Sequence, residues 1–162
     1  MFIKKVEEQT IAATYTPTHS FADFLVDDQI KQNIIKKGYT APTPIQDKVI
    51  PVLLDGKDVI ATANTGTGKT AAFLIPLIHN VLSVKSKRLF IVTPSRELAS
   101  QIHSELNAFR ANTGLSSVLC IGGLNITFQT NHLKKHPAFV VGTPGRLRDL
   151  EQTKALNFVA YD

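Results

Sequence analysis

The stretch of sequence that decides the fold is 58-DVIATANTGTGKTAAFLI-75. Its first four residues are typical of the end of a buried strand, and its last five are typical of an apolar helix. Between these elements, Gly66 and Gly68 favour a tight turn that directs backbone N–H groups and the start of a helix at one point. Such an arrangement suits a polyphosphate. We therefore predict that this loop binds a nucleoside phosphate.

The end of the loop carries side chains suited to phosphate chemistry. Lys69 would reach the β- and γ-phosphates, and the Thr70 hydroxyl would take one coordination place on Mg²⁺. The usual pattern, G-x-x-x-x-G-K-T, opens with a glycine, and Ala63 stands in that place. A flexible turn between two elements is the alternative, but Lys-Thr after two spaced glycines argues against it. The predicted nucleotide-binding residues of the loop are Ala63, Thr65, Gly66, Thr67, Gly68, Lys69 and Thr70.

Length and composition indicate an ordinary globular domain. The chain has 162 residues, of which 43% are hydrophobic and 19% are charged. It contains no apolar run close to the ~18 residues of a membrane span, and its charged N-terminus lacks a signal-peptide core. The single Cys120 lies in an apolar run, so we expect a buried thiol in a cytoplasmic protein. The net charge of +5 is compatible with a polyanionic partner without requiring one.

Strand and helix patterns alternate along most of the chain. Apolar runs recur at 58–63, 88–93, 116–121, 138–142 and 157–161, with helical stretches such as 69–83 and 95–110 between them. This alternation predicts an α/β fold with a mainly parallel sheet and right-handed crossovers. In such a sheet, ligands gather at the carboxyl ends of the strands.

The residues before the phosphate loop predict a helical lead-in to that sheet. Residues 1–20 have no sustained period and are expected to be extended, so we place the domain at residues 21–162. Residues 21–37 favour one or two short helices that end at Gly38. A further helix is expected over 45–54, interrupted or kinked near Pro51.

Two predicted strand ends carry nearly the same four residues, Thr93-Pro94-Ser95-Arg96 and Thr143-Pro144-Gly145-Arg146. In both, the threonine can cap a helix, and the proline suits its first turn. An arginine near the start of a helix is unfavourable unless an anion shares the site. The pair Gly122-Gly123, at a third strand end, allows close backbone approach. Phosphate sites along one sheet edge suggest a nucleic-acid backbone, although two capped helices with surface arginines are the alternative.

These residues together resemble the N-terminal RecA-like domain of DEAD-box ATP-dependent RNA helicases. The matching segments are 38-GYTAPTPIQ-46, which is similar to the family's Q motif, 63-ANTGTGKT-70, 94-PSRELA-99, 122-GG-123, 143-TPGR-146 and 159-VAYD-162. Phe21 stands 17 residues before Gly38, where the family keeps an isolated aromatic residue. The resemblance covers about residues 20–162 and implies a three-layer RecA-like P-loop NTPase domain.

The resemblance implies a role for each matching residue. The Gln46 amide can donate and accept hydrogen bonds at once, which matches the edge of adenine, and Phe21 would stack on the adenine face near Tyr39. Asp162 would hold Mg²⁺ through water and, with Lys69 and Thr70, would take part in catalysis. RNA phosphates and sugars would be contacted, without sequence readout, by Pro94, Arg96, Gly122, Gly123, Thr143 and Arg146.

The sequence departs from the family pattern mainly at its end. Asn64 replaces the usual glutamine and Ser95 the usual threonine, and both changes are mild. The glutamate expected after Asp162, the Ser-Ala-Thr motif and the second RecA-like domain are not in the sequence. We therefore expect this chain alone to lack ATPase and unwinding activity. The segments 58–63 and 157–162 are expected to face a gap in the sheet, which favours aggregation.

Three functions are consistent with these motifs. The leading prediction is the ATP-binding and RNA-binding half of an RNA helicase that works with a second RecA-like domain. A truncated, non-catalytic module that holds nucleotide or RNA is the second. A different P-loop enzyme such as a nucleotide kinase is the third, but the Q motif and the paired T-P-x-R strand ends argue against it.

Overall fold

A parallel sheet forms the centre of the computed structural model, which describes residues 15–84 and 86–161. Its strands are β1 (Leu89–Val92), β2 (Ser117–Cys120) and β3 (Phe139–Gly142), in the order β1-β3-β2. Both neighbouring pairs are parallel, and Val92 and Cys120 both lie opposite Gly142. The three strands therefore end side by side at one edge of the sheet. The prediction of an α/β fold with a parallel sheet is confirmed.

The helices are α1 (Asp28–Lys36), α2 (Pro44–Leu54), α3 (Lys69–Ser83), α4 (Arg96–Phe109), α5 (Ile126–Leu133) and α6 (Pro144–Gln152), followed by the short 3-10 helix η1 (Phe158–Ala160). Local sequence accounts for several of their ends. Helix α1 begins where the Asp27 side chain accepts a hydrogen bond from the Gln29 N–H at 2.8 Å. It ends before Gly38, whose φ of +78° is left-handed, as the sequence predicts.

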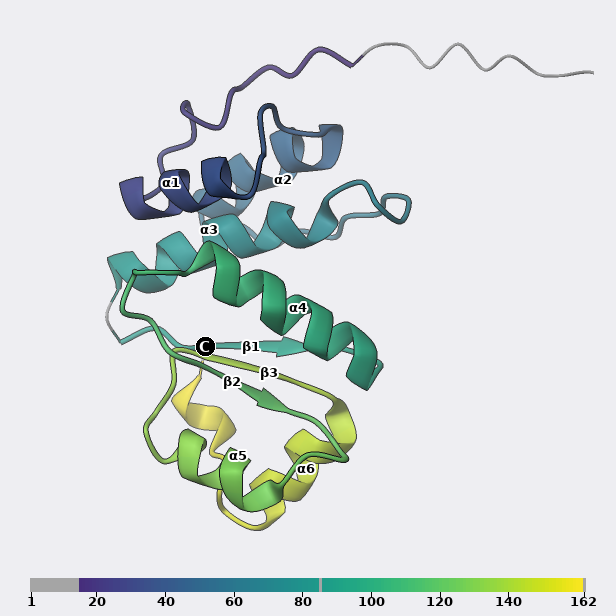
Figure 1. The fold of residues 1–162 in the computed structure, drawn as a ribbon, viewed down its shortest axis with the longest axis vertical. Coiled ribbons are helices and arrows are strands. Elements are labelled where there is room, and N and C mark those ends of the chain that lie inside the picture. The colour runs from purple at the N-terminus through teal and green to yellow at the C-terminus, as the bar shows by residue number, and fades with distance from the viewer. Residues whose placement is uncertain (1–14, 85, 162) are drawn as a thin grey trace, which may run out of the picture.

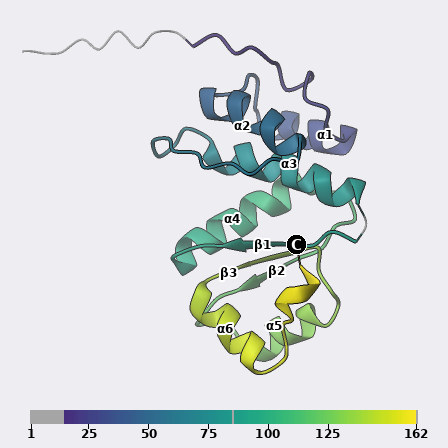
Figure 2. The same ribbon diagram turned by 180° about the vertical axis from the view of Figure 1, so that it is seen from behind.

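Each face of the sheet packs on its own hydrophobic cluster. Figures 1 and 2 show helices α1–α4 on one side of the sheet and α5 and α6 on the other. The larger cluster includes Ile34, Leu74, Ile78, Leu106, Phe109 and Phe139, and the smaller includes Val118, Cys120, Leu133, Val140 and Leu147. All four residues of the central strand β3 are buried. Burial on both faces explains why this strand reads as a continuous apolar run.

Two segments that the sequence predicts as strands, 58–63 and 157–161, do not form strands. Extended backbone needs a neighbouring strand for its N–H and C=O groups. Within the described part of the chain, β1 pairs only with β3, and a groove separates its free edge from residues 58–63. The other segment folds into η1 and packs on Phe90 through Phe158 and Tyr161, with ring centroids 5.2 and 4.3 Å away. Among the residues that the structure describes, neither segment has a strand beside it, and residues 58–62 are exposed.

The start of one helix differs from the sequence prediction, and another helix is not interrupted where an interruption or a kink is predicted. Helix α4 is capped by Ser95, whose hydroxyl accepts from the Leu98 N–H at 3.2 Å, and Thr93 lies before the cap. The Thr93 hydroxyl instead donates to the Ser95 carbonyl at 3.0 Å. Pro51 lies inside α2 without interrupting it. No helix among the described residues combines the length and the apolar character needed to cross a membrane.

Candidate functional site

The predicted phosphate loop is a tight turn that opens α3. Gly66 and Gly68 have φ angles of +80° and +84°, which a residue with a side chain rarely adopts. The Thr67 hydroxyl closes the turn by donating to the Asn64 carbonyl at 2.8 Å. Lys69, the first residue of α3, donates to the carbonyls of Ala63 and Asn64, the latter at 2.8 Å. These contacts hold the ammonium group over the loop, beside the start of the helix.

The start of α2 braces this loop through hydrogen bonds. The Thr43 hydroxyl donates to the Thr67 carbonyl at 2.8 Å. The Gln46 amide donates to the Gly68 carbonyl at 3.2 Å and accepts from the Thr43 N–H at 3.0 Å. A Cβ atom on Gly68 would lie only 2.3 Å from the Gln46 amide nitrogen, so the glycine permits this contact. The Q-motif segment and the phosphate loop therefore form one hydrogen-bonded unit.

The two residues expected to bind adenine are engaged by protein groups. Gln46 is 0% exposed, and both ends of its amide already have partners. Phe21 is 8% exposed, and its ring meets Tyr39 edge-on with centroids 5.9 Å apart. A second N–H and a second lone pair on the Gln46 amide remain available for an adenine edge. A base would reach these groups only after their neighbours move.

The strand ends bring the second predicted set of residues together. The Thr93 N–H donates to the Gly142 carbonyl at 2.9 Å, and the Thr143 N–H donates to the Cys120 carbonyl at 3.2 Å. An open recess of about 440 Å³ lies between residues 94–97 and residues 143–145. Its walls are the starts of α4 and α6, so backbone N–H groups of two helices converge on one place. Such a recess suits an anion.

The two predicted arginines lie against the glycine pair and its neighbour. The Arg96 guanidinium crosses Gly122 so closely that a Cβ atom there would lie 2.8 Å from it. The Arg146 guanidinium donates to the Leu124 carbonyl at 3.3 Å. Its Nε atom is buried and has no hydrogen-bond partner among the described residues. The arginines and glycines predicted from separate motifs are thus neighbours in space.

Cys120 confirms the expectation of a buried thiol. Its side chain is 0% exposed at the end of β2. Burial raises the pKa of the thiol to about 12, although the positive charge of Arg146 works in the other direction. The thiol is therefore protonated at neutral pH and acts as a small apolar group.

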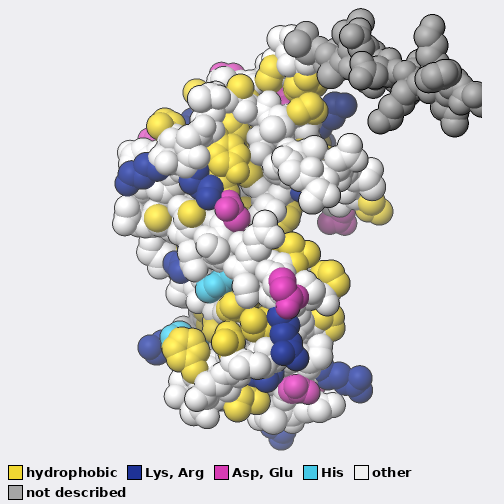
Figure 3. All heavy atoms as spheres, turned by 45° about the vertical axis from the view of Figure 1, so that its right-hand side comes forward, with side chains coloured by type: hydrophobic (Ala, Val, Ile, Leu, Met, Phe, Trp, Pro, Cys, Tyr) yellow, Lys and Arg dark blue, Asp and Glu magenta, His cyan; other side chains and the backbone are white. Residues whose placement is uncertain are grey.

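The phosphate loop and the strand-end recess lie on the same side of the molecule. Figure 1 shows the loop before α3 projecting on the side toward which the strands point. Between the two sites lies a groove of about 560 Å³, lined on one bank by Lys69 and Thr70 and on the other by Val92 and Leu98. Figure 3 shows this surface indented between its upper and lower parts, with hydrophobic side chains along the indentation. One face can therefore present two separate anion sites.

Two residues with long-range contacts near the site have no role assigned by the motifs, and one predicted residue lies outside the described residues. Asp162, proposed as a Mg²⁺ ligand, lies outside the described residues. The motifs assign no separate role to Thr43, although it belongs to the Q motif and holds the phosphate loop. They assign none to Asp47 either, yet it is buried and accepts several hydrogen bonds from residues 15–19. No local signal in the sequence identifies that contact.

Comparison with known proteins adds independent evidence. The family model described as DEAD/DEAH box helicase matches residues 43–162. The DEAD-box ATP-dependent RNA helicase RhpA of Helicobacter pylori is 42% identical over 130 residues, covering 80% of this chain and 26% of that protein. The ATP-dependent rRNA helicase RRP3 of Encephalitozoon cuniculi is 45% identical over 130 residues, covering 80% of this chain and 32% of that protein.

The fold is similar to solved structures over most of its length. The crystal structure of a DEAD box protein from the hyperthermophile Methanococcus jannaschii matches with a TM-score of 0.82 and 39% identity. That match covers 88% of this chain and 39% of the other chain. The chain thus spans only about a quarter to a third of the length of the two curated relatives above, at 26% and 32%.

Proposed function

The chain belongs to the DEAD/DEAH box helicase family, and we propose that it is the ATP-binding and RNA-backbone-binding half of an ATP-dependent RNA helicase. The observation that carries the proposal is the pairing of two anion sites on one face. The phosphate loop is braced by the start of α2, and the strand-end recess holds Arg96 beside Gly122. In the whole enzyme, ATP hydrolysis would be coupled to RNA unwinding or remodelling, with a second RecA-like domain as partner.

The phosphate loop supports binding of ATP with Mg²⁺. The backbone N–H groups around Gly66 and Gly68 and the ammonium group of Lys69 would hold the phosphates. The Thr70 hydroxyl, at the second position of α3, would hold the metal ion, with Asp162 acting through water. Hard oxygen ligands of this kind are those that Mg²⁺ prefers. The ion would supply charge neutralisation at the phosphates.

Adenine selectivity is tested by titrating ADP and GDP against wild type, Gln46→Ala and Thr43→Val. Losing a bidentate amide contact to adenine costs roughly 1–3 kcal/mol, or about tenfold to a hundredfold in affinity. If Gln46 forms hydrogen bonds with adenine, Gln46→Ala should weaken the binding of ADP much more than the binding of GDP. Thr43→Val removes the hydroxyl that braces Thr67 and takes part in the capping box of α2, but it keeps the Gln46 side chain, so it should weaken binding of both nucleotides alike. Equal weakening of both nucleotides by Gln46→Ala would mean that Gln46 only supports the loop.

RNA binding is tested with a labelled single-stranded RNA and its shuffled control over a salt series. Because the site offers few cations, the affinity should be weak and should fall with a log–log slope of about −0.7 per neutralised phosphate. Arg96→Ala should weaken binding to both sequences alike. Arg148→Ala, a change of the same kind at an exposed position of α6, is the matched control. Strong preference for one sequence would contradict backbone recognition.

We propose that the chain of 162 residues has no ATPase or unwinding activity by itself. Phosphoryl transfer to water requires a positioned base and charge-neutralising groups around the γ-phosphate. The edge of β1 that has no strand partner among the described residues, and the apolar groove beside it, also favour self-association. Size-exclusion chromatography tests whether the chain self-associates. Phosphate release measured on the monomeric fraction tests whether it hydrolyses ATP. Turnover above background by a stable monomer would contradict the proposal.

The second candidate function is a non-catalytic module that holds nucleotide or RNA through the same two anion sites. The two candidates differ in the codons that come after residue 162 in the gene. A reading frame that continues with Glu-Ala-Asp supports the helicase, and a stop codon supports the module. A cytoplasmic location is proposed for either.

A further inference from the structure

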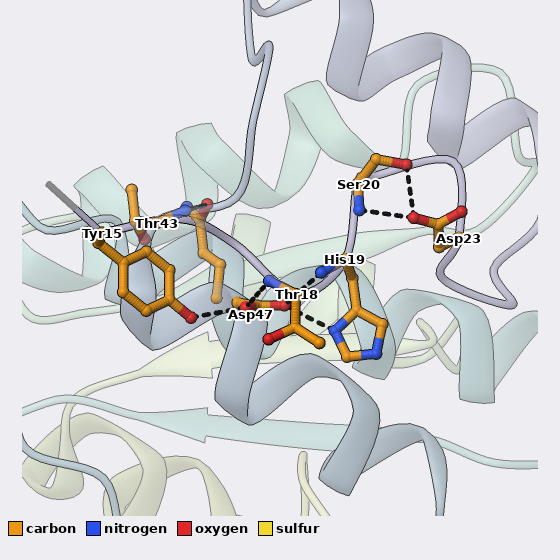
Figure 4. Close-up of polar contacts among 8 residues, drawn as sticks. Tyr15, Thr18, His19, Ser20, Asp23, Thr43 and Asp47 are labelled. Carbon is orange, nitrogen blue, oxygen red and sulfur yellow. Dashed lines mark hydrogen bonds and ion pairs between the residues drawn. The ribbon is translucent and has the colours of Figure 1, made fainter.

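The carboxylate of Asp47 binds the polypeptide that precedes the first helix. Its Oδ2 atom accepts from the Tyr15 hydroxyl at 2.5 Å and the Thr18 N–H at 2.8 Å. Its Oδ1 atom accepts from the His19 N–H at 3.1 Å and lies 2.7 Å from His19 Nδ1. Figure 4 shows these groups converging on Asp47 from one stretch of chain. We name Asp47, Tyr15, Thr18 and His19 together the Asp47 clamp.

The electrostatics of the clamp show that it holds an ionised carboxylate. Asp47 is only 4% exposed, and burial alone would raise its pKa. The hydrogen bonds from Tyr15, Thr18 and His19 outweigh that effect and hold the pKa of Asp47 well below its usual range. The hydrogen bond to Asp47 also raises the pKa of the Tyr15 hydroxyl. A buried charge of this kind persists only while its hydrogen-bond donors stay in place.

The clamp is adjacent to the brace of the phosphate loop. Gln46 and Asp47 are consecutive residues in the first turn of α2, so their side chains leave the helix about 100° apart. Gln46 reaches Gly68 in the loop, and Asp47 reaches residues 15–19. Two residues beyond His19, Phe21 packs on Tyr39. One helical turn therefore joins the lead-in segment, the predicted adenine-binding aromatic residue and the phosphate loop.

We propose that Asp47 is a positioning residue for nucleotide binding, which acts by fastening residues 15–19 to α2. The clamp fixes the approach of the chain to Phe21 and holds the turn that carries Gln46. This inference rests on the proposed nucleotide site. Because coupling between two sites is reciprocal, nucleotide binding should in turn tighten the clamp.

The test combines hydrogen exchange with ADP titration of the 162-residue chain. Asp47→Ala should speed exchange of the Thr18 and His19 amides by about tenfold or more, since each loses a charged acceptor. It should lower the affinity for ADP at least about fivefold, which is the lower end of the coupling usually found between two binding sites. Asp55→Asn, at an exposed carboxylate at the other end of α2, is the control and should change neither measurement.

Tyr15→Phe provides a milder variant that leaves α2 intact. It removes one hydroxyl from a partly exposed side chain, so it should shift both measurements in the same direction by less. It decides the question if Asp47→Ala does not fold. Bound ADP should also slow exchange at Thr18 and His19 in the wild type.

The outcomes separate this inference from the proposed function. If the wild type does not bind ADP, the proposed nucleotide site fails, and the positioning role fails with it. If the wild type binds ADP and Asp47→Ala releases residues 15–19 without weakening ADP, only the positioning role fails. If exchange at Thr18 and His19 is unchanged in both variants, the clamp itself is overturned.

Discussion

Substituting Gly68 by alanine should destabilise the protein both through its backbone conformation and through the contact with Gln46. A left-handed backbone costs an L-residue about 1–2 kcal/mol. At Gly68 the new methyl group would also lie 2.3 Å from the Gln46 amide nitrogen and would displace that amide. The hydrogen bonds from Gln46 to the Gly68 carbonyl and from the Thr43 N–H to Gln46 would be lost, at about 1 kcal/mol each. The free energy of unfolding should therefore fall by about 3–4 kcal/mol.

Gly66→Ala is a matched control that measures the cost of the left-handed backbone alone. Gly66 has a φ of +80°, close to the +84° of Gly68, but a Cβ atom there would meet nothing within 4 Å. Its substitution should cost only about 1–2 kcal/mol. Urea unfolding followed by far-ultraviolet circular dichroism measures both variants under the same conditions. An equal loss of stability in the two variants would refute the argument from the Gln46 contact.

A double-mutant cycle isolates the contact itself. In a Gln46→Ala background the amide is gone, so Gly68→Ala should cost only the backbone term. The two substitutions should then be non-additive by about 2 kcal/mol. Additive effects would mean that the loop relaxes without displacing Gln46. In that case the phosphate loop would be held by the start of α2 through Thr43 and not through Gln46.

Three other predictions concern buried polar groups. Asn33, 2% exposed, donates to two backbone carbonyls at the end of α4, so Asn33→Ala should lower the free energy of unfolding by about 2–3 kcal/mol, measured by urea titration. Cys120, whose pKa burial raises to about 12, should react with a thiol reagent only in denaturant, and fast labelling of the folded chain would contradict its burial. Asp47 has a lowered pKa in the folded state, so its contribution to stability is present above the unfolded pKa of about 3.9 and is lost as the pH falls through the folded pKa. Unfolding midpoints measured from pH 5 downward should therefore drop more steeply for the wild type than for Asp47→Asn.

The sequence predicted what depends on local patterns. The helix expected over 69–83 is α3 with the same bounds, and β1, β2 and β3 lie within three of the five apolar runs. The shared T-P-x-R pattern also placed two strand ends together correctly. These features depend on hydrophobic spacing and on turn residues, which can be recognised within short stretches of sequence.

The features that the sequence did not predict depend on distant partners. Residues 58–63 have the composition of a strand, but a strand forms only where another strand lies beside it. The Thr43 contact with Thr67 spans 24 residues, and the Tyr15 contact with Asp47 spans 32. Asp47 resembles any acidic residue in the first turn of a helix. Only the folded chain shows that it is buried and bound.

The strand order has a consequence for how the chain folds during synthesis. β1 and β2 flank β3 and do not pair with each other, although both precede β3 in the sequence. Among the described residues, neither of the earlier strands has a strand partner until residues 139–142 have been synthesised. The helices made earlier can form from local contacts, but the sheet must wait for its central strand and then close over long sequence separations. The nascent chain therefore carries exposed apolar strand segments from the synthesis of β1 until that of β3, a state in which chaperone binding competes with aggregation.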